Sequence, residues 1–419
     1  MKHLNALKTP GSGFRTYRRA GLIVLFFGLT AYFLLPVWAA PTSNYDSLRL
    51  YTEALFEITQ KYVWPKNEET LIYGSLRGMM NSLDPDSSFL TAKEYQAYLT
   101  GDKSSPAEAG MVLIVKDNLL TAVSVIDDSP ASRAGLKPGD HIIKMDGHQV
   151  RNLTTQEASR RFQGAPNTAI KLQVLRNGEV KPLDLTVTLE PLGVSTVTSR
   201  YLEHNVAYVR IRYFNNETPA ELATALKSIS QHQPPVKGIV LDLRNNARGT
   251  MEEAVRSTSL LLGDQQILTA KGRAAKSEEI FKGKERDLVF KKLPSIVVLV
   301  DQGTARAAEI MAGALRDQAR VTLVGVKTLG LCGLTKAFPL EDGSALVMTV
   351  SQCYTPKGDK IQGKGLEPGV PGVTAKDEKG EKKKAPAKEM TPEQDPWVQQ
   401  AVDLLTSGNP PAAPKAKAS

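Results

Sequence analysis

Residues Ile296 to Pro368 contain the stretch that decides the fold, and they read IVVLVDQGTARAAEIMAGALRDQARVTLVGVKTLGLCGLTKAFPLEDGSALVMTVSQCYTPKGDKIQGKGLEP. The first five residues, Ile296 to Val300, form an apolar run that is short enough and β-branched enough for a fully buried strand. Asp301-Gln302-Gly303-Thr304 interrupts the run, and Ala305 to Arg316 is rich in strong helix formers. The pattern predicts a strand that turns sharply into a helix, where backbone amides are able to hold an oxyanion.

The residues at this turn carry a family resemblance. Gly303-Thr304-Ala305-Arg306-Ala307-Ala308-Glu309-Ile310 resembles the turn G-[ST]-A-S-A-[AS]-E-I of the C-terminal processing (tail-specific) serine peptidases. The resemblance extends from about Tyr45 to Val373. In that family the second Ser of the turn is the nucleophile, so the resemblance implies that Arg306 stands at the nucleophile's position.

A second family segment, [ST]-F-G-K-G-x-V-Q, supplies a Lys general base and a Gln that orients it. The similar segment here is Thr328-Leu329-Gly330-Leu331-Cys332-Gly333-Leu334-Thr335, so Leu331 replaces the Lys and Thr335 replaces the Gln. A Ser/Lys mechanism needs a hydroxyl that attacks and a neutral amine that accepts its proton. Arg stays protonated and Leu has no proton acceptor. We therefore expect a member of this serine endopeptidase family that has lost its activity.

The alternative is an active endopeptidase with a different catalytic arrangement. Thr304 lies two residues before Arg306, and Cys332 follows Leu331, so either is a candidate substitute nucleophile. Neighbours two residues apart in a turn rarely point the same way, and no His between Ile296 and Pro368 is present to activate a thiol. A third interpretation is a purely architectural role in a membrane complex.

Composition sets wide limits on the function. The chain has 419 residues, 41% of them apolar, which is enough for two or three domains with real cores. Its formal charge is +9, but no nucleic-acid-binding module or basic motif with interleaved aromatic residues is present, so we expect no nucleic-acid partner. No metal or cofactor is expected.

Residues 1–40 predict a signal peptide or a membrane anchor. Ala20 to Ala40 are 21 residues without a charge, enough to span a bilayer, and the basic residues before them would keep the N-terminus in the cytoplasm. Val37-Trp38-Ala39 is also typical of a signal-peptidase site, so cleavage and anchoring stay open. Either way the body would be exported, which predicts the periplasmic side of a bacterial inner membrane.

Residues 41–104 predict a helical region. Leu48, Tyr51, Leu55 and Ile58 recur at helical spacing, and the turn Leu83 to Leu90 leads into a helix capped near Thr91. The resemblance places an L-D-P-H-S-like turn here, with Asp86 in place of His. In the family this region helps assembly, so the resemblance implies a homo-oligomer. The residues alone predict a packing region without a catalytic role, that is, packing without chemistry.

Residues 105–192 resemble a PDZ domain. Ser129 to Asp140 read SPASRAGLKPGD, close to the signature S-P-A-x-x-A-G-L-x-x-G-D. Ala109-Gly110-Met111-Val112-Leu113-Ile114 resembles the loop that receives a peptide's C-terminal carboxylate, with Ala109 in place of the usual first Gly. Thr155 to Phe162 would be the helix beside the groove, in which a peptide adds a strand to the sheet edge.

Residues 193–374 resemble the peptidase core, of the ClpP/crotonase type. Val236 to Asn246 matches the family's strand into an R-N-N-P-G-G loop, which ordinarily supplies an oxyanion donor. Here the loop continues Ala247-Arg248-Gly249. Arg248 and Arg306 would then lie near one former catalytic cleft, and they either point into solvent or hold a carboxylate or another anion there.

The two cysteines lie on a predicted hairpin with its turn at Glu341-Asp342-Gly343-Ser344. If Leu340 faces Ala345, Cys332 faces Cys353. A disulfide and two buried free thiols are both compatible with this pairing.

Together these patterns predict a multidomain α+β protein with an N-terminal helical segment, a PDZ domain and an α/β peptidase core. Residues 375–419 predict a charged linker, a short amphipathic helix after Asp395-Pro396, and a Pro/Ala/Lys tail. The expected function is binding of protein C-terminal tails, as a scaffold or as a regulator of an active peptidase homologue.

Overall fold

The computed structural model describes residues 43–100, 106–116, 119–150, 153–274, 277–319, 321–373 and 391–407. The predicted signal peptide or anchor and most of the charged linker and tail lie outside these ranges. The chain divides into two compact units, one up to Leu71 and one from Ile72. None of the helices within the described ranges combines the length and hydropathy that a bilayer span requires.

The first unit contains helix α2 (Ser43–Lys61) and the start of α3 (Glu68–Asn81). The apolar stripe of the sequence lies on α2, where Leu48 and Ile58 are largely exposed. In the second unit, α4 (Ala92–Leu99) begins after Thr91, which caps it as predicted: the Thr91 hydroxyl accepts from the Glu94 amide, and the Glu94 carboxylate accepts from the Thr91 amide.

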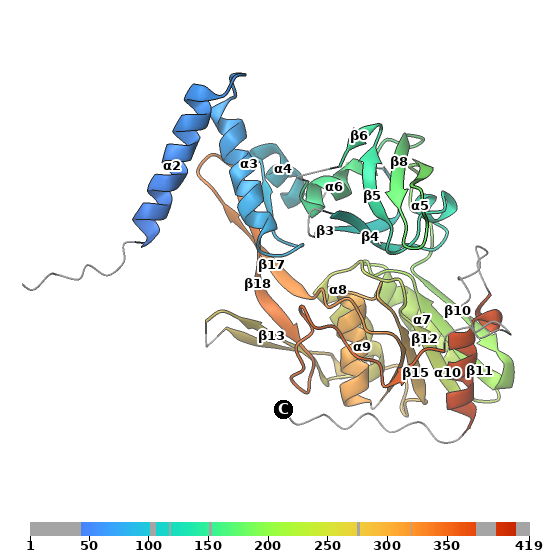
Figure 1. The fold of residues 1–419 in the computed structure, drawn as a ribbon. Coiled ribbons are helices and arrows are strands. Elements are labelled where there is room, and N and C mark those ends of the chain that lie inside the picture. Colours follow the sequence, from blue (N-terminus) through green and yellow to red (C-terminus); the bar gives the residue numbers. More distant parts are fainter. Residues whose placement is uncertain are drawn as a thin grey trace, which may run out of the picture. The chain divides into compact units, whose positions relative to one another are not determined.

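The PDZ domain is built on an antiparallel sheet in the order β3-β4-β5-β8-β9, with β6 paired to β5 (Figure 1). Its strands are β3 (Met111–Lys116), β4 (Leu119–Val125), β5 (His141–Met145), β6 (His148–Gln149), β8 (Ala169–Leu175) and β9 (Leu183–Thr188). The short strands β2 (Ala107–Glu108) and β7 (Gln163–Gly164) pair beside it, and the signature Ser129 to Asp140 contains the short helix α5 (Pro130–Arg133). Helix α6 (Thr155–Arg161) contacts β3, where the Thr155 hydroxyl accepts from the Val115 amide at 3.0 Å.

The peptidase-like core is built on a six-stranded sheet, β10-β11-β12-β15-β16-β19, which is parallel except for β10. Its strands are β10 (Val197–Leu202), β11 (Val206–Ile211), β12 (Gly238–Asp242), β15 (Ile296–Val300), β16 (Thr322–Gly325) and β19 (Val370–Pro371). Helices cover both faces of this sheet: α7 (Thr218–Ser230), α8 (Met251–Leu262) and α9 (Ala307–Gln318) on one, α10 (Pro396–Thr406) on the other (Figure 1).

The two covered faces explain why β15 is apolar at every position. Ile296, Val298 and Val300 belong to the core that contains α8 and α9, whereas Val297 and Leu299 pack with α10. A strand buried on both faces has no position left for a polar side chain.

A second sheet joins β1 (Ser88–Leu90), β18 (Ala345–Tyr354), β13 (Gln266–Gly272) and β14 (Glu278–Lys282), with β17 (Gly333–Pro339) also on β18. The predicted β17–β18 register was wrong by one residue at the turn, because Pro339, not Leu340, lies opposite Ala345. The Leu340 amide donates to the Ser344 carbonyl across a three-residue loop in which Gly343 has φ 81°.

A bulge further along the hairpin reverses this offset. The pairing shifts by one residue between Leu334 and Thr335, so Gly333 lies opposite Gln352. The two shifts cancel, and the Cys353 amide donates to the Cys332 carbonyl at 3.1 Å.

Candidate functional site

The predicted strand-to-helix turn lies at the carboxyl end of β15. Arg306 is the N-cap residue of α9, and its backbone has φ 51° and ψ −118°. A non-glycine residue at such angles stores roughly 1–3 kcal/mol of strain and persists only where its surroundings hold it. Here the Arg306 amide donates to the Leu331 carbonyl at 3.0 Å, so the two segments that carry the family resemblance hold each other.

The Arg306 guanidinium is committed to groups of this chain. Nη1 donates to the Ala247 carbonyl at 2.9 Å, and Nη2 donates to Asp86 Oδ1 at 2.5 Å. The Arg306 side chain is 25% exposed and that of Asp86 is 11% exposed, so the ion pair is well shielded from water. Sequence reasoning singled out both residues as departures from the family pattern but did not connect them.

Thr304, a candidate substitute nucleophile, is fully buried. Its hydroxyl donates to the Leu243 carbonyl at 2.8 Å and accepts from the Asp301 amide at 2.9 Å. Both bonds stay within the turn and the neighbouring strand end. Thr304 is therefore a structural residue of the turn.

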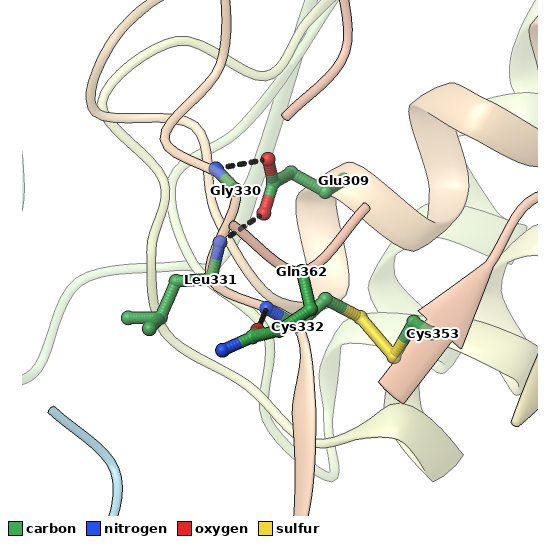
Figure 2. Close-up of a disulfide and its surroundings, with 6 residues drawn as sticks. All are labelled: Glu309, Gly330, Leu331, Cys332, Cys353 and Gln362. Carbon is green, nitrogen blue, oxygen red and sulfur yellow. Dashed lines mark hydrogen bonds between the residues drawn. A yellow bond between two sulfur atoms is a disulfide. The ribbon is translucent and has the colours of Figure 1, made fainter. Parts of the chain in front are cut away.

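Beneath the turn lies Glu309, a buried acid that sequence reasoning did not assign to the site. Its carboxylate accepts from the amides of Gly330 and Leu331, at 2.7 and 3.0 Å (Figure 2). It also accepts from the Thr328 hydroxyl at 2.5 Å. Burial raises the pKa of Glu309 to about 7, against the opposing effect of these hydrogen bonds. The one signal in the sequence was an acid in an otherwise apolar helix segment.

Leu331, which the family resemblance places at the position of the Lys, is 5% exposed. It belongs to an apolar cluster with Ala247 and Ala305 of the core and with Ile114 and Val123 of the PDZ domain. The Leu331 side chain is therefore packed at a seam between the PDZ domain and the core.

Next to Leu331, Cys332 forms a disulfide with Cys353 (Figure 2), with a Cα–Cα distance of 5.6 Å. The Cys332 amide also donates to Gln362 Oε1 at 2.6 Å. As the second candidate nucleophile, Cys332 has no thiol in this state of the protein.

The loop that resembles the family's oxyanion loop places Arg248 against the PDZ domain. Its Nη1 donates to both carboxylate oxygens of Glu108, at 2.9 Å each, and its guanidinium lies 5.4 Å from the centre of the Tyr213 ring. Gly249 follows with φ 132°, and a Cβ there would lie 2.4 Å from the Cβ of Phe214. Arg248, like Arg306, is thus paired with a carboxylate of the chain itself.

The predicted carboxylate-binding loop of the PDZ domain is partly occupied by internal bonds. The Ala109 amide donates to the Phe162 carbonyl at 3.0 Å, which removes it as a donor to a ligand. Gly110 has φ 74°, and a Cβ there would lie 2.3 Å from the Cβ of Ser129. From Met111 onward the chain forms strand β3, which faces α6.

The PDZ domain is fastened to the core beside the same loop. The side chain of Asn245 accepts from the Val125 amide at 2.8 Å and also donates to the Val125 carbonyl. The Ser124 hydroxyl donates to the Asn245 carbonyl at 2.8 Å, and Arg210 lies 2.9 Å from Asp127. Backbone, side-chain and ionic contacts together hold the groove against the core.

A cavity of about 780 Å³ brings most of the predicted site together. The predicted site residues that line it are Met111, Val112, Leu113, Arg248, Gly249, Arg306, Cys332, Thr335 and Cys353. Ala109, Gly110 and Leu331 are buried and are not part of its described lining. Thr155, Gln156 and Ser159 of α6 also line it, so the PDZ groove and the cleft around Arg306 are one space.

The N-terminal helical region contributes a wall that sequence reasoning did not predict. Pro85, Asp86 and Tyr98 line the cavity. The expectation of packing without chemistry was therefore incomplete, because this region closes one side of the candidate binding site.

The combination of a PDZ domain with a peptidase-like core that share one cavity is typical of PDZ-containing peptidases. Residues 107–187 match the PDZ domain, and residues 205–371 match peptidase family S41. The chain belongs to this family of carboxy-terminal processing proteases, as its sequence motifs predicted.

Proteins of similar sequence occur in bacteria. The carboxy-terminal-processing protease of Bartonella bacilliformis is 34% identical over 78% of this chain and 75% of its own length. CtpA of Bacillus subtilis is 33% identical, with 78% and 69% covered. The structure of a photosystem II D1 C-terminal processing protease is similar, with a TM-score of 0.64, 25% identity, and 77% and 92% of the two chains covered.

Proposed function

We propose that this protein is a catalytically inactive member of its family that binds the C-terminal tails of other proteins through its PDZ groove, as a scaffold or regulator. The observation that carries the proposal is the Arg306 guanidinium, which stands at the nucleophile's position and is held by Asp86 and the Ala247 carbonyl. A guanidinium neither attacks a carbonyl nor accepts a proton at ordinary pH.

The rest of the cavity supports inactivity. No Lys or His is among the described residues that line it, so this lining offers neither an amine nor an imidazole as a general base. Thr304 uses its hydroxyl in the turn, and Cys332 is in a disulfide. These contacts leave the two alternative nucleophiles without a free reactive group.

Tail binding is supported by the groove itself. Strand β3 and helix α6 line the same cavity. Strand β3 is the terminal strand of its sheet, where an extended peptide would add a strand. Because the Ala109 amide is used internally, we expect the amides that follow it to receive the carboxylate. An active family member that processes the same tails is a natural partner for such a protein.

We further propose that the protein acts on the periplasmic side of a bacterial inner membrane. The support is the uncharged segment Ala20 to Ala40 behind a basic N-terminus, and a disulfide, which persists in an oxidising compartment. Cleaved and anchored forms remain alternatives. We also propose a homo-oligomer, on the basis of the family resemblance of the helical region.

The test incubates the full-length protein with an unfolded protein that ends in apolar residues, beside an Arg306→Ala variant, and follows both by mass spectrometry. We expect no products, together with binding of a labelled tail peptide that disappears when its carboxylate is amidated. Cleavage products that form at the same rate with the wild type and with Arg306→Ala would refute the proposal. Thr304 and Cys332 would then be the candidate nucleophiles to test. Absence of both cleavage and binding would leave only the architectural role.

A further inference from the structure

Acidic residues outnumber basic residues in the lining of the shared cavity. They are the acids Asp86, Glu108, Glu252 and Glu253 and the bases Arg248 and Arg306, with a formal charge of −2. Each base is already paired, Arg306 with Asp86 and Arg248 with Glu108. The pairs neutralise each other, so the excess charge belongs to Glu252 and Glu253.

Both excess acids lie in the first turn of α8, where the N-terminal end of the helix favours negative charge. Glu252 is exposed. Glu253 accepts from the Thr250 amide at 2.7 Å through one carboxylate oxygen. Neither acid has an ion-pair partner within 4.0 Å in the described chain.

Other charges beside the groove do not restore the balance. Glu157 and Arg160 of α6 are paired with Arg77 and Glu94, at 2.7 and 2.8 Å, and these pairs are outside the cavity lining. The hypothesis that the two arginines hold an external anion is therefore not supported, because carboxylates of the chain occupy that role.

We infer that the groove selects basic tails: peptides with Lys or Arg a few residues before an apolar C-terminus that carries a free carboxylate. The inference rests on the proposed function, since the peptide must first lie along β3 and α6. The remainder of the peptide then extends through a space whose net charge is negative, and a cationic side chain complements Glu252 and Glu253.

The test measures fluorescence anisotropy of labelled peptides on the full-length protein. The peptides share the same apolar C-terminal residues and differ only in Lys, Gln or Glu at the positions before them. A partly exposed carboxylate contributes about two- to fivefold in affinity for a cation, so we expect the Lys peptide to bind about tenfold more tightly than the Glu peptide. The preference should shrink as salt is added.

Two variants test whether Glu252 and Glu253 cause the preference for the Lys peptide. The double variant Glu252→Gln/Glu253→Gln removes both charges, and Gln at position 253 keeps the capping bond. Glu279→Gln on β14 removes an exposed charge outside the cavity and serves as the control. We expect the preference to collapse in the double variant and to persist in the control.

Three other results would count against the inference. Equal affinity for the Lys and Glu peptides, or a preference that survives the double variant, would overturn charge selection while leaving tail binding intact. If no peptide with a free carboxylate binds, the proposed function fails and the inference fails with it.

Discussion

Removal of the Arg306 side chain should loosen the contact between the turn that contains Asp86 and the strand-to-helix turn that contains Arg306. In Arg306→Ala, Asp86, which is 11% exposed in the wild type, loses its cation, and the Ala247 carbonyl loses a donor. A surface ion pair contributes about 0–1 kcal/mol, and breaking a buried one costs about 3–5 kcal/mol. Because Arg306 is one-quarter exposed, we expect a cost between these limits, about 2 kcal/mol.

The backbone of Arg306 adds a second effect that a further variant isolates. A residue with a Cβ is strained at the Arg306 backbone angle of φ 51°, whereas glycine adopts this angle without strain. Arg306→Gly removes the same ion pair but relieves this strain, so it should be about 1 kcal/mol more stable than Arg306→Ala.

The assay is urea unfolding followed by circular dichroism for the wild type, Arg306→Ala, Asp86→Ala and the double variant. The two single losses should not add, with a coupling free energy of about 1–2 kcal/mol. A coupling below about 0.3 kcal/mol would refute the argument that this ion pair joins the two turns. Equal stability of the Gly and Ala variants would refute the strain argument.

Three further predictions concern the segment beneath the cavity. The pKa of Glu309 is about 7 in the folded protein, above its ordinary value of 4.5. Protonated Glu309 therefore contributes its whole share of the free energy of unfolding below pH 4.5. This contribution, up to about 3 kcal/mol, is lost as the pH rises through 7. Urea titrations across this pH range should show that decline in the wild type and not in Glu309→Gln. Cys332→Ser/Cys353→Ser opens a loop with a sequence separation of 21 and should lower stability by about 3 kcal/mol; an unchanged melting temperature would contradict a formed bond. Leu331→Ala should cost about 2–4 kcal/mol through the cavity it leaves, and faster proteolysis at the seam between the PDZ domain and the core would reveal it, whereas Leu331→Met should change little.

Local patterns were sufficient for the main elements because each depends on neighbours in the chain. The apolar run Ile296 to Val300 is strand β15, and Thr91 caps α4. The signature Ser129 to Asp140 lies in the PDZ domain, and the helix after Asp395 is α10. In each case the periodicity or the capping residue acts over a few positions.

Contacts between distant segments were beyond sequence reasoning. Asp86 and Arg306 are 220 residues apart, and nothing in either local pattern indicates that they meet. The hairpin register was missed because a three-residue loop and a bulge are set by backbone geometry, and the correct cysteine pairing followed only because the two offsets cancel.

The sequence by itself determined the family and the order of the PDZ and peptidase domains along the chain. It also predicted that Arg306, Leu331 and Thr335 stand where the family has Ser, Lys and Gln, because residue identity and short-range spacing carry that information. Only the tertiary structure decided what these side chains touch. Arg306 and Arg248 are neutralised by Asp86 and Glu108, and Leu331 packs at the seam between the domains. Charge pairing and apolar packing depend on which segments meet in space, and that is the result of folding the whole chain.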